Sequence, residues 1–233
     1  MIQGLDDLLA ATLVFVAGHF LLSSRVLRQP LAGRLGEPGF RILYSLIAGA
    51  ALLWMIFAYG AAPVVPLWEP PLALRWLPLV LMPFAVFLVL AGVTTPNSTM
   101  VGGERVVDGG PENQTPGIAR ITRHPFLWGV TLWALGHLAV RGDGASMILF
   151  GGILVLALGG MWHIDQKREA SLGANWGPIR LTTSVIPFAA LASGRTQMDW
   201  RGIGWWRPLA ALVLYAALLH FHVPLFGVSP LPV

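Results

Sequence analysis

RHPFLWGVTLWALGH, residues 123–137, is the stretch that decides the fold: a basic pair and a proline open an apolar run that ends on a second histidine. A membrane-crossing α-helix needs about 20 mainly apolar residues, so this run is short unless its helix begins near Ile121. Proline is tolerated in the first turn of a helix, and an arginine there reaches toward lipid phosphates. The stretch therefore predicts a membrane helix with an imidazole at each end.

The whole chain shares this apolar character. Of its 233 residues, 55% are hydrophobic and 11% are charged, and the mean hydropathy is +0.68, whereas a soluble domain carries about 25% charged residues. The composition predicts a membrane protein with several spans, and the net charge of +4 is no sign of nucleic-acid binding. The absence of cysteine excludes disulfides, thiolate metal ligands and covalently attached haem. We expect the acidic, apolar N-terminal stretch to be a retained helix rather than a signal peptide.

Six stretches have the composition of membrane-crossing helices, at about residues 5–23, 40–61, 75–93, 125–140, 145–165 and 207–223. Pro78 and Pro83 fall inside the third stretch and predict a kink there. The sequence therefore predicts an all-α fold, a polytopic bundle of about six transmembrane helices.

The basic residues alternate between the loops, and this pattern gives the expected orientation. Arg75 and Arg141 lie on one side, and the other thirteen of the fifteen lie on the opposite side: Arg25, Arg28, Arg34, Arg41, Arg105, Arg120, Arg123, Lys167, Arg168, Arg180, Arg195, Arg201 and Arg207. The positive-inside rule places these thirteen in the cytoplasm and both termini on the periplasmic side. The same pattern predicts two long cytoplasmic loops, at about 94–122 and 166–206.

All six histidines lie within or at the ends of the expected spans, where ionisable residues are rare and functional by default. At about 1.5 Å per residue, they form two layers: an inner layer of His19, His124 and His163 and an outer layer of His137, His220 and His222. A single imidazole in a helix is usually hydrogen-bonded to a neighbour. Two imidazoles on different helices can instead hold a haem iron through one nitrogen each. Heights alone leave several pairs open, including His19 with His137 and His137 with His220.

Two common catalytic chemistries lack their patterns in this chain. It contains no HExxH sequence, which disfavours a zinc hydrolase, and no GxSxG, which disfavours a serine hydrolase. The sequence therefore identifies no catalytic residue, and the histidines are the candidates for a functional site.

Several stretches resemble the NnrU family of bacterial integral membrane proteins. They follow the family's order along the chain: GHFLLSSRVLR at 18–28, LGEPGFRILYSL at 35–46, PLWEPP at 66–71, GIARITRHPFLWGVTLWALGH at 117–137 and TTSVIPFAALASGR at 182–195. The resemblance covers nearly the whole chain and implies a single NnrU-type transmembrane domain over residues 1–233, in the bacterial inner membrane. The family is linked by association to denitrification and nitric-oxide metabolism.

The NnrU family is similar to the zeta-carotene isomerases, which are haem b membrane enzymes. This resemblance implies non-covalent haem b, with His19 and His137 as the axial ligands of the iron, and it implies that Arg123 and His124 contact the pocket or a lipid headgroup. It also implies an isomerase of a hydrophobic polyene. Ala134 departs from the isomerase pattern, which has a cysteine here that is thought to exchange as an iron ligand. Haem binding therefore does not by itself imply carotene isomerisation in this chain.

Two alternatives stay open. RHP at 123–125 also resembles the core of isoprenylcysteine and phospholipid methyltransferases, and the residues that would follow it in those enzymes are present in order: Asp165, Glu169, Gly173, Trp176 and Pro187. That resemblance implies a cytoplasmic S-adenosylmethionine site contacted by Arg123 and His124. The other alternative is a non-enzymatic assembly or sensing factor for respiratory metalloenzymes. The expected partners are the lipid bilayer and a hydrophobic polyene or gas ligand, and no nucleic acid.

Overall fold

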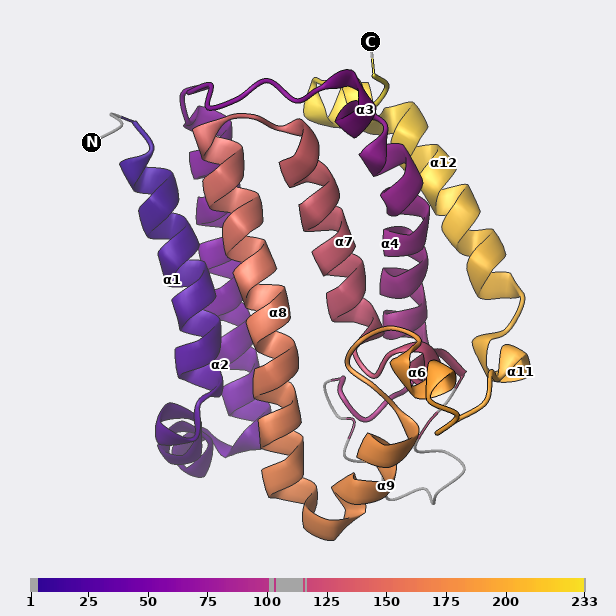
Figure 1. Cartoon of the computed structure of the whole chain (residues 1–233). Helices are drawn as coiled ribbons and strands as arrows, with labels where there is room; N and C mark the ends of the chain where they lie inside the picture. Colours follow the sequence, from indigo (N-terminus) through magenta and orange to yellow (C-terminus); the bar gives the residue numbers. More distant parts are fainter. Residues whose placement is uncertain (1–3, 101–102, 104–114, 116, 233) are drawn as a thin grey trace.

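The computed structural model describes residues 4–100, 103, 115 and 117–232. In this part of the chain the fold is helical and has no β-strand, which confirms the predicted all-α class. Six long helices make up most of it: α1 (Asp6–Ser23), α2 (Arg25–Ala61), α4 (Leu77–Thr94), α7 (Pro125–Val140), α8 (Gly144–Leu172) and α12 (Trp206–Phe226). They run alternately down and up, and both ends of the chain lie at the same end of the molecule (Figure 1).

Each of the six expected spans corresponds to one of these helices. Among the described residues, five helices are long and apolar enough to cross a membrane. The sixth, α7, has 16 residues and is about 24 Å long, against a hydrocarbon core of about 30 Å. The number of crossings and the orientation of the termini therefore remain predictions.

The start of α7 shows why this helix is short. A separate short helix, α6 (Gly117–Ile121), ends where the longer helix was expected to begin. His124 lies between α6 and α7 with φ −119° and ψ 57°, outside the helical region. A residue before proline is sterically disfavoured in the helical conformation, so Pro125 sets the boundary and occupies the first turn.

The prolines of α4 behave differently from each other. Pro78 lies in the first turn, where its missing N–H costs no hydrogen bond. It therefore does not interrupt the helix, although the sequence predicted a kink there. Pro83 lies inside α4, which remains one helical element from Leu77 to Thr94.

The second helix, α2, is longer than the expected span because it includes a bend. Helical turns over residues 25–35 precede Gly36, which has φ 71° and ψ 163°, and the chain then continues as the expected span. Only glycine adopts such a positive φ without a steric penalty from Cβ. An ion pair between Arg28 Nη2 and Glu37 Oε2, 2.8 Å apart, connects the two sides of the bend.

The long helices form an open row. Along the row α1, α8, α7, α4 and α12 each pack against the next, and α2 packs against α1 and also contacts α8. The largest apolar core lies where α1, α2, α7 and α8 meet, around Leu8, Met55, Ala134 and Phe150. At one end of the row, α12 packs against α4 and has Ala211 as its one buried residue. The remaining faces of α12 are largely apolar and exposed.

The two expected long loops differ from their prediction in different ways. Of the first, residues 94–122, the structure describes 94–100, 103, 115 and 117–122, and residues 101–102, 104–114 and 116 lie outside the described part of the chain. Residues 166–206 are mainly helical: α8 continues to Leu172, and it is followed by η2 (Gly173–Asn175), α9 (Trp176–Thr182), α10 (Ala189–Ala192) and α11 (Trp200–Ile203). These short helices fold back beneath α4 and α7, at the end opposite the termini (Figure 1). A further short helix, α3 (Leu72–Arg75), precedes α4 at the other end.

Candidate functional site

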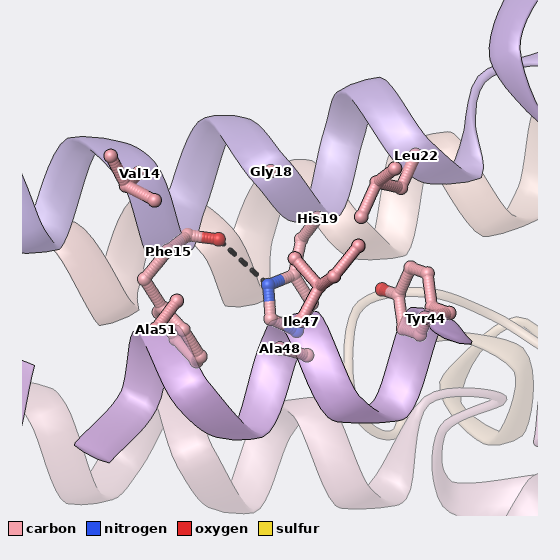
Figure 2. A pocket seen from close by; sticks show the side chains of 9 residues that line it. All are labelled: Val14, Phe15, Gly18, His19, Leu22, Tyr44, Ile47, Ala48 and Ala51. Atoms are coloured by element: carbon pink, nitrogen blue, oxygen red, sulfur yellow. Dashed lines mark hydrogen bonds between the residues drawn. The ribbon is translucent and has the colours of Figure 1, made fainter. Parts of the chain in front are cut away.

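His19 lies on α1 and faces α2. Its Nδ1 is 2.7 Å from the carbonyl oxygen of Phe15, and its ring meets the rings of Phe15 and Tyr44 edge-on, at 4.5 and 5.6 Å between centroids. Because Nδ1 faces a carbonyl it carries the proton, which leaves the lone pair on Nε2. Figure 2 shows the hollow beside this ring, lined by α1 and α2, with a volume of about 10 Å³. That volume is about what one water molecule needs.

His137 lies on α7 and faces α8. Its Nδ1 is 2.8 Å from the carbonyl oxygen of Trp133, so it has the same tautomer as His19. The imidazole stacks on the ring of Phe150, with centroids 4.9 Å apart, and tilts against Trp133 at 5.0 Å. Ala134, one turn before His137, is fully buried in the main core.

The structure does not bring these two histidines together. His19 faces α2, whereas His137 packs on α8, which lies between α1 and α7 in the row. Phe20, next to His19, packs beside Gly159 of α8, nine residues beyond the Phe150 that contacts His137. Nine helical residues rise roughly 13 Å, so the two imidazoles lie at different heights.

A haem between His19 and His137 would need two suitable donor atoms and enough space for the porphyrin. The donor chemistry fits, since each imidazole has Nδ1 held by a backbone carbonyl and a free Nε2, which is how iron-ligating histidines are oriented. The space between the two histidines does not fit a haem. Phe15 contacts His19, and Phe150 and Trp133 contact His137. All three aromatic side chains pack in or against the same apolar core. In this packing aromatic side chains fill the core next to both rings, and the axial pair remains a prediction.

The other membrane histidines have local partners. His163 Nε2 is 3.1 Å from Ser23 Oγ and connects α8 to the end of α1. His222 Nδ1 is 2.8 Å from the carbonyl oxygen of Val228, and the His220 ring packs edge-on against Phe221. Within the described residues, no group of three or more histidine or acidic side chains is placed to hold a metal ion.

Arg123 and His124 converge on Asp165 of α8. His124 Nε2 is 2.9 Å from Asp165 Oδ1, and Arg123 Nη1 is 3.4 Å from Asp165 Oδ2. The side chains of Arg123 and His124 are 8% and 1% exposed, and that of Asp165 is 21% exposed. The Arg123 guanidinium also lies over the ring of Trp176, 5.8 Å from its centroid. Burial lowers the pKa of Arg123 while the Asp165 carboxylate raises it, and an arginine keeps its charge in either case.

This cluster retains unused hydrogen-bonding capacity. His124 Nδ1 and Arg123 Nε are buried without a hydrogen-bond partner among the described residues, although buried polar groups are normally paired. An ionised carboxylate only accepts hydrogen bonds, so Nε2 of His124 donates to Asp165. An imidazole held in this way on one side and free on the other is arranged as a general acid or base is.

Residues 183–188 dock onto residues 121–128 beside the cluster. The N–H of Arg123 donates to the carbonyl of Ser184 at 2.9 Å, and the N–H of Phe188 donates to the carbonyl of Ile121 at 2.8 Å. Thr122 Oγ1 and Trp128 Nε1 both donate to the carbonyl of Val185 at 2.8 Å. This contact could not be predicted from the sequence, because no periodicity or charge pairing relates segments about 60 residues apart.

The family model described as "NnrU protein" matches residues 7–230. The chain belongs to the NnrU family. No solved structure matches it.

Two curated relatives of the NnrU chain carry the name 15-cis-zeta-carotene isomerase, chloroplastic. The protein from Zea mays is 30% identical over 115 residues, which is 48% of this chain and 31% of the relative. The protein from Arabidopsis thaliana is 38% identical over 79 residues, which is 34% of this chain and 22% of the relative. The chain therefore matches less than a third of the length of each relative.

The residues shared with the methyltransferase pattern do not leave a free cationic site in this NnrU chain. Arg123 and His124, which would contact the carboxylate of S-adenosylmethionine, both face Asp165 instead. Glu169 lies at the surface, where its Oε1 is 3.3 Å from Arg180 Nη1. The structure thus brings Asp165 and Trp176 to Arg123 but places Glu169 outside the cluster.

Proposed function

We propose that this NnrU chain is a membrane-embedded isomerase of a linear hydrophobic polyene. The observation that carries the proposal is the similarity to two proteins named 15-cis-zeta-carotene isomerase, together with five helices long and apolar enough to cross a membrane among the described residues. A polyene of this class dissolves in the bilayer, so an enzyme acting on it gains from an apolar, membrane-embedded scaffold.

Within that proposal, His19 and His137 are the residues we expect to bind the cofactor. Each presents an unprotonated Nε2 inside an apolar span, and each is oriented by the backbone carbonyl one turn earlier. Haem b, as implied by the resemblance to the isomerases, would require the aromatic rings between these helices to repack. We therefore derive no catalytic step through haem, and its presence is a question for the experiment below.

The experiment reconstitutes the purified chain in lipid nanodiscs with 15-cis-zeta-carotene, in the dark. The proposal predicts conversion to another geometric isomer, measured by chromatography with absorbance detection, at a rate proportional to protein. Protein-free nanodiscs measure thermal isomerisation. No conversion above that background, by protein with an intact helical spectrum, would contradict the proposed function.

An absorbance spectrum of the same preparation tests the cofactor separately. Haem held by His19 and His137 predicts a Soret band that is lost or shifted in His19→Ala and in His137→Ala and is unchanged in the control His222→Ala, on α12. Unchanged spectra in the first two variants would remove this axial pair. A haem-containing protein that is inactive on the polyene, with a Soret band that shifts with nitric oxide, would favour the sensing alternative. A colourless protein that binds S-adenosylmethionine would favour the methyltransferase alternative.

A further inference from the structure

We infer that residues 181–206, here called the cap segment, lie in the membrane interface with apolar side chains inserted among the lipids, and are not a loop in water. The partner of this surface is the lipid leaflet at the end of the molecule opposite the termini. The inference rests on the helical membrane fold and is independent of the proposed catalytic function.

The height of the cap segment is set by its hydrogen bonds to α7. The carbonyl oxygen of Val185 accepts the N–H of the Trp128 indole at 2.8 Å, and Trp128 lies one turn inside a helix that begins at Pro125. The same carbonyl accepts the hydroxyl of Thr122. Residues 184–188 therefore lie level with the lower end of α7, as the orange trace in Figure 1 shows, and not beyond it.

At this height the cap segment exposes large apolar side chains. Ile186 is 67% exposed and Phe188 is 53% exposed, although each flanks residues that are bonded to α6 and α7. Phe188 also has φ 65°, a left-handed conformation that is unusual for a bulky residue. The backbone is thus held in an unfavourable conformation at a point where an aromatic side chain points outward.

The second half of the cap segment has the composition of a membrane interface. Three tryptophans and an arginine lie close together there, Trp200, Arg201, Trp205 and Trp206. Tryptophan is enriched at the level of lipid headgroups, and arginine there pairs with phosphates. Trp200 and Trp205 are 72% and 80% exposed.

This surface continues directly into a face that we expect lipid to cover. Trp205 and Trp206 line a shallow apolar hollow together with Leu209, Val213 and other residues of α12. Since α12 is apolar enough to cross a membrane and packs on its row neighbour α4, its outer face meets acyl chains. The continuity of the two surfaces favours lipid over a protein partner.

The absence of cysteine in the chain allows a direct test by site-directed spin labelling. Single-cysteine variants Ile186→Cys, Phe188→Cys and Trp200→Cys are labelled in nanodiscs, and collision of each label with oxygen, which concentrates in lipid, is compared with collision with a water-soluble nickel chelate. Phe57→Cys, exposed in the apolar part of α2 about one turn before the helix ends at Ala61, is the lipid reference. Ala174→Cys, exposed in the turn after α8, is the water reference.

We expect the labels at 186 and 188 to favour oxygen, as the label at 57 does, and the label at 200 to fall between the two references. Ser193→Cys, an exposed polar position of the same segment, is expected to favour nickel. Nickel accessibility at 186 and 188 equal to that at 174 would place the segment in water and overturn the inference. Low accessibility to both reagents would indicate coverage by protein and would also overturn it.

Discussion

At the scale of single residues, loss of the Asp165 carboxylate is the change with the clearest expected effect on the stability of the fold. This carboxylate is the counter-charge for a guanidinium that is 8% exposed and the acceptor for an imidazole that is 1% exposed. Asp165→Asn keeps the shape but leaves Arg123 buried beside a neutral amide. Because breaking a buried pair strands an uncompensated charge, and because Asp165 is partly open to solvent, we expect a loss of about 2–3 kcal/mol. Thermal unfolding in nanodiscs, followed by circular dichroism, measures it.

The matched control lies one turn further along α8. Glu169 forms a comparable ion pair with Arg180, but both side chains are more than half exposed. Exposed pairs contribute little, so Glu169→Gln is expected to change stability by less than about 1 kcal/mol. Equal effects of the two substitutions would show that Asp165 does not act through burial of its partners.

Residue positions could be predicted from the sequence better than residue partners could. Counting along each span placed His163 in the inner layer with His19, and the structure confirms this order, because His163 contacts Ser23 one turn from His19. Periodicity did not reveal that His124 meets Asp165, because that contact joins two helices whose relative rotation depends on packing. The sequence did not predict that α1 is rotated so that His19 faces α2, for the same reason.

At the scale of elements, glycines determine how closely α4 and α7 approach each other. A Cβ at Gly129 would lie 2.7 Å from the carbonyl oxygen of Ala85 and 2.6 Å from a methyl of Val89. Gly129→Ala is therefore expected to push α4 and α7 apart and to destabilise the fold by about 1–3 kcal/mol, as overpacking does. The control is Gly151→Ala on α8, where a Cβ meets nothing within 4 Å. Thermal unfolding in nanodiscs compares the stability of the two variants. That control should be neutral or stabilising by up to about 1 kcal/mol, and a matching loss in both variants would contradict the close-packing argument.

The contact between residues 183–188 and the start of α7 gives a second prediction at this scale. Thr122→Val keeps the side-chain shape but removes the hydroxyl that donates to the carbonyl of Val185 and accepts the N–H of His124. The expected cost is about 1 kcal/mol, confined to the docked segment. Hydrogen exchange followed by mass spectrometry should show faster exchange in a peptide covering 183–190, with no change in α1. Exchange that rises across the whole chain would mean that the hydroxyl supports the global fold instead.

The elements themselves show what the sequence can and cannot reveal. Apolar length predicted six helices at their observed places, since a membrane span must satisfy its own backbone hydrogen bonds. It did not predict that residues 166–206 are mainly helical. Helices as short as α10, with four residues, carry no periodic signal and form through packing: α10 and α11 contact α6, and α9 contacts α8.

At the scale of the whole molecule, the open row explains why a site between α1 and α7 could not be located from heights alone. Heights order residues along the membrane normal, whereas the order of helices across the membrane comes from side-chain packing. Here α8 separates α1 from α7, although these two helices carry the two histidines that the family resemblance pairs. The row also leaves α12 covered by protein on one side only, and we expect lipid to cover the other side.

The orientation of this row in the membrane yields the last prediction. The structure places both ends of the chain on the side away from the basic residues near the cap segment (Figure 1), and the positive-inside rule puts that basic side in the cytoplasm. In intact bacterial cells, a membrane-impermeant maleimide should therefore label Asp6→Cys and Ser229→Cys but not Ala174→Cys, which should react only after the cells are opened. Labelling is read from a mass shift of the purified protein. If one terminus reacts and the other does not, the number of crossings is odd, and the 16-residue α7, about 24 Å long, is the helix that fails to cross.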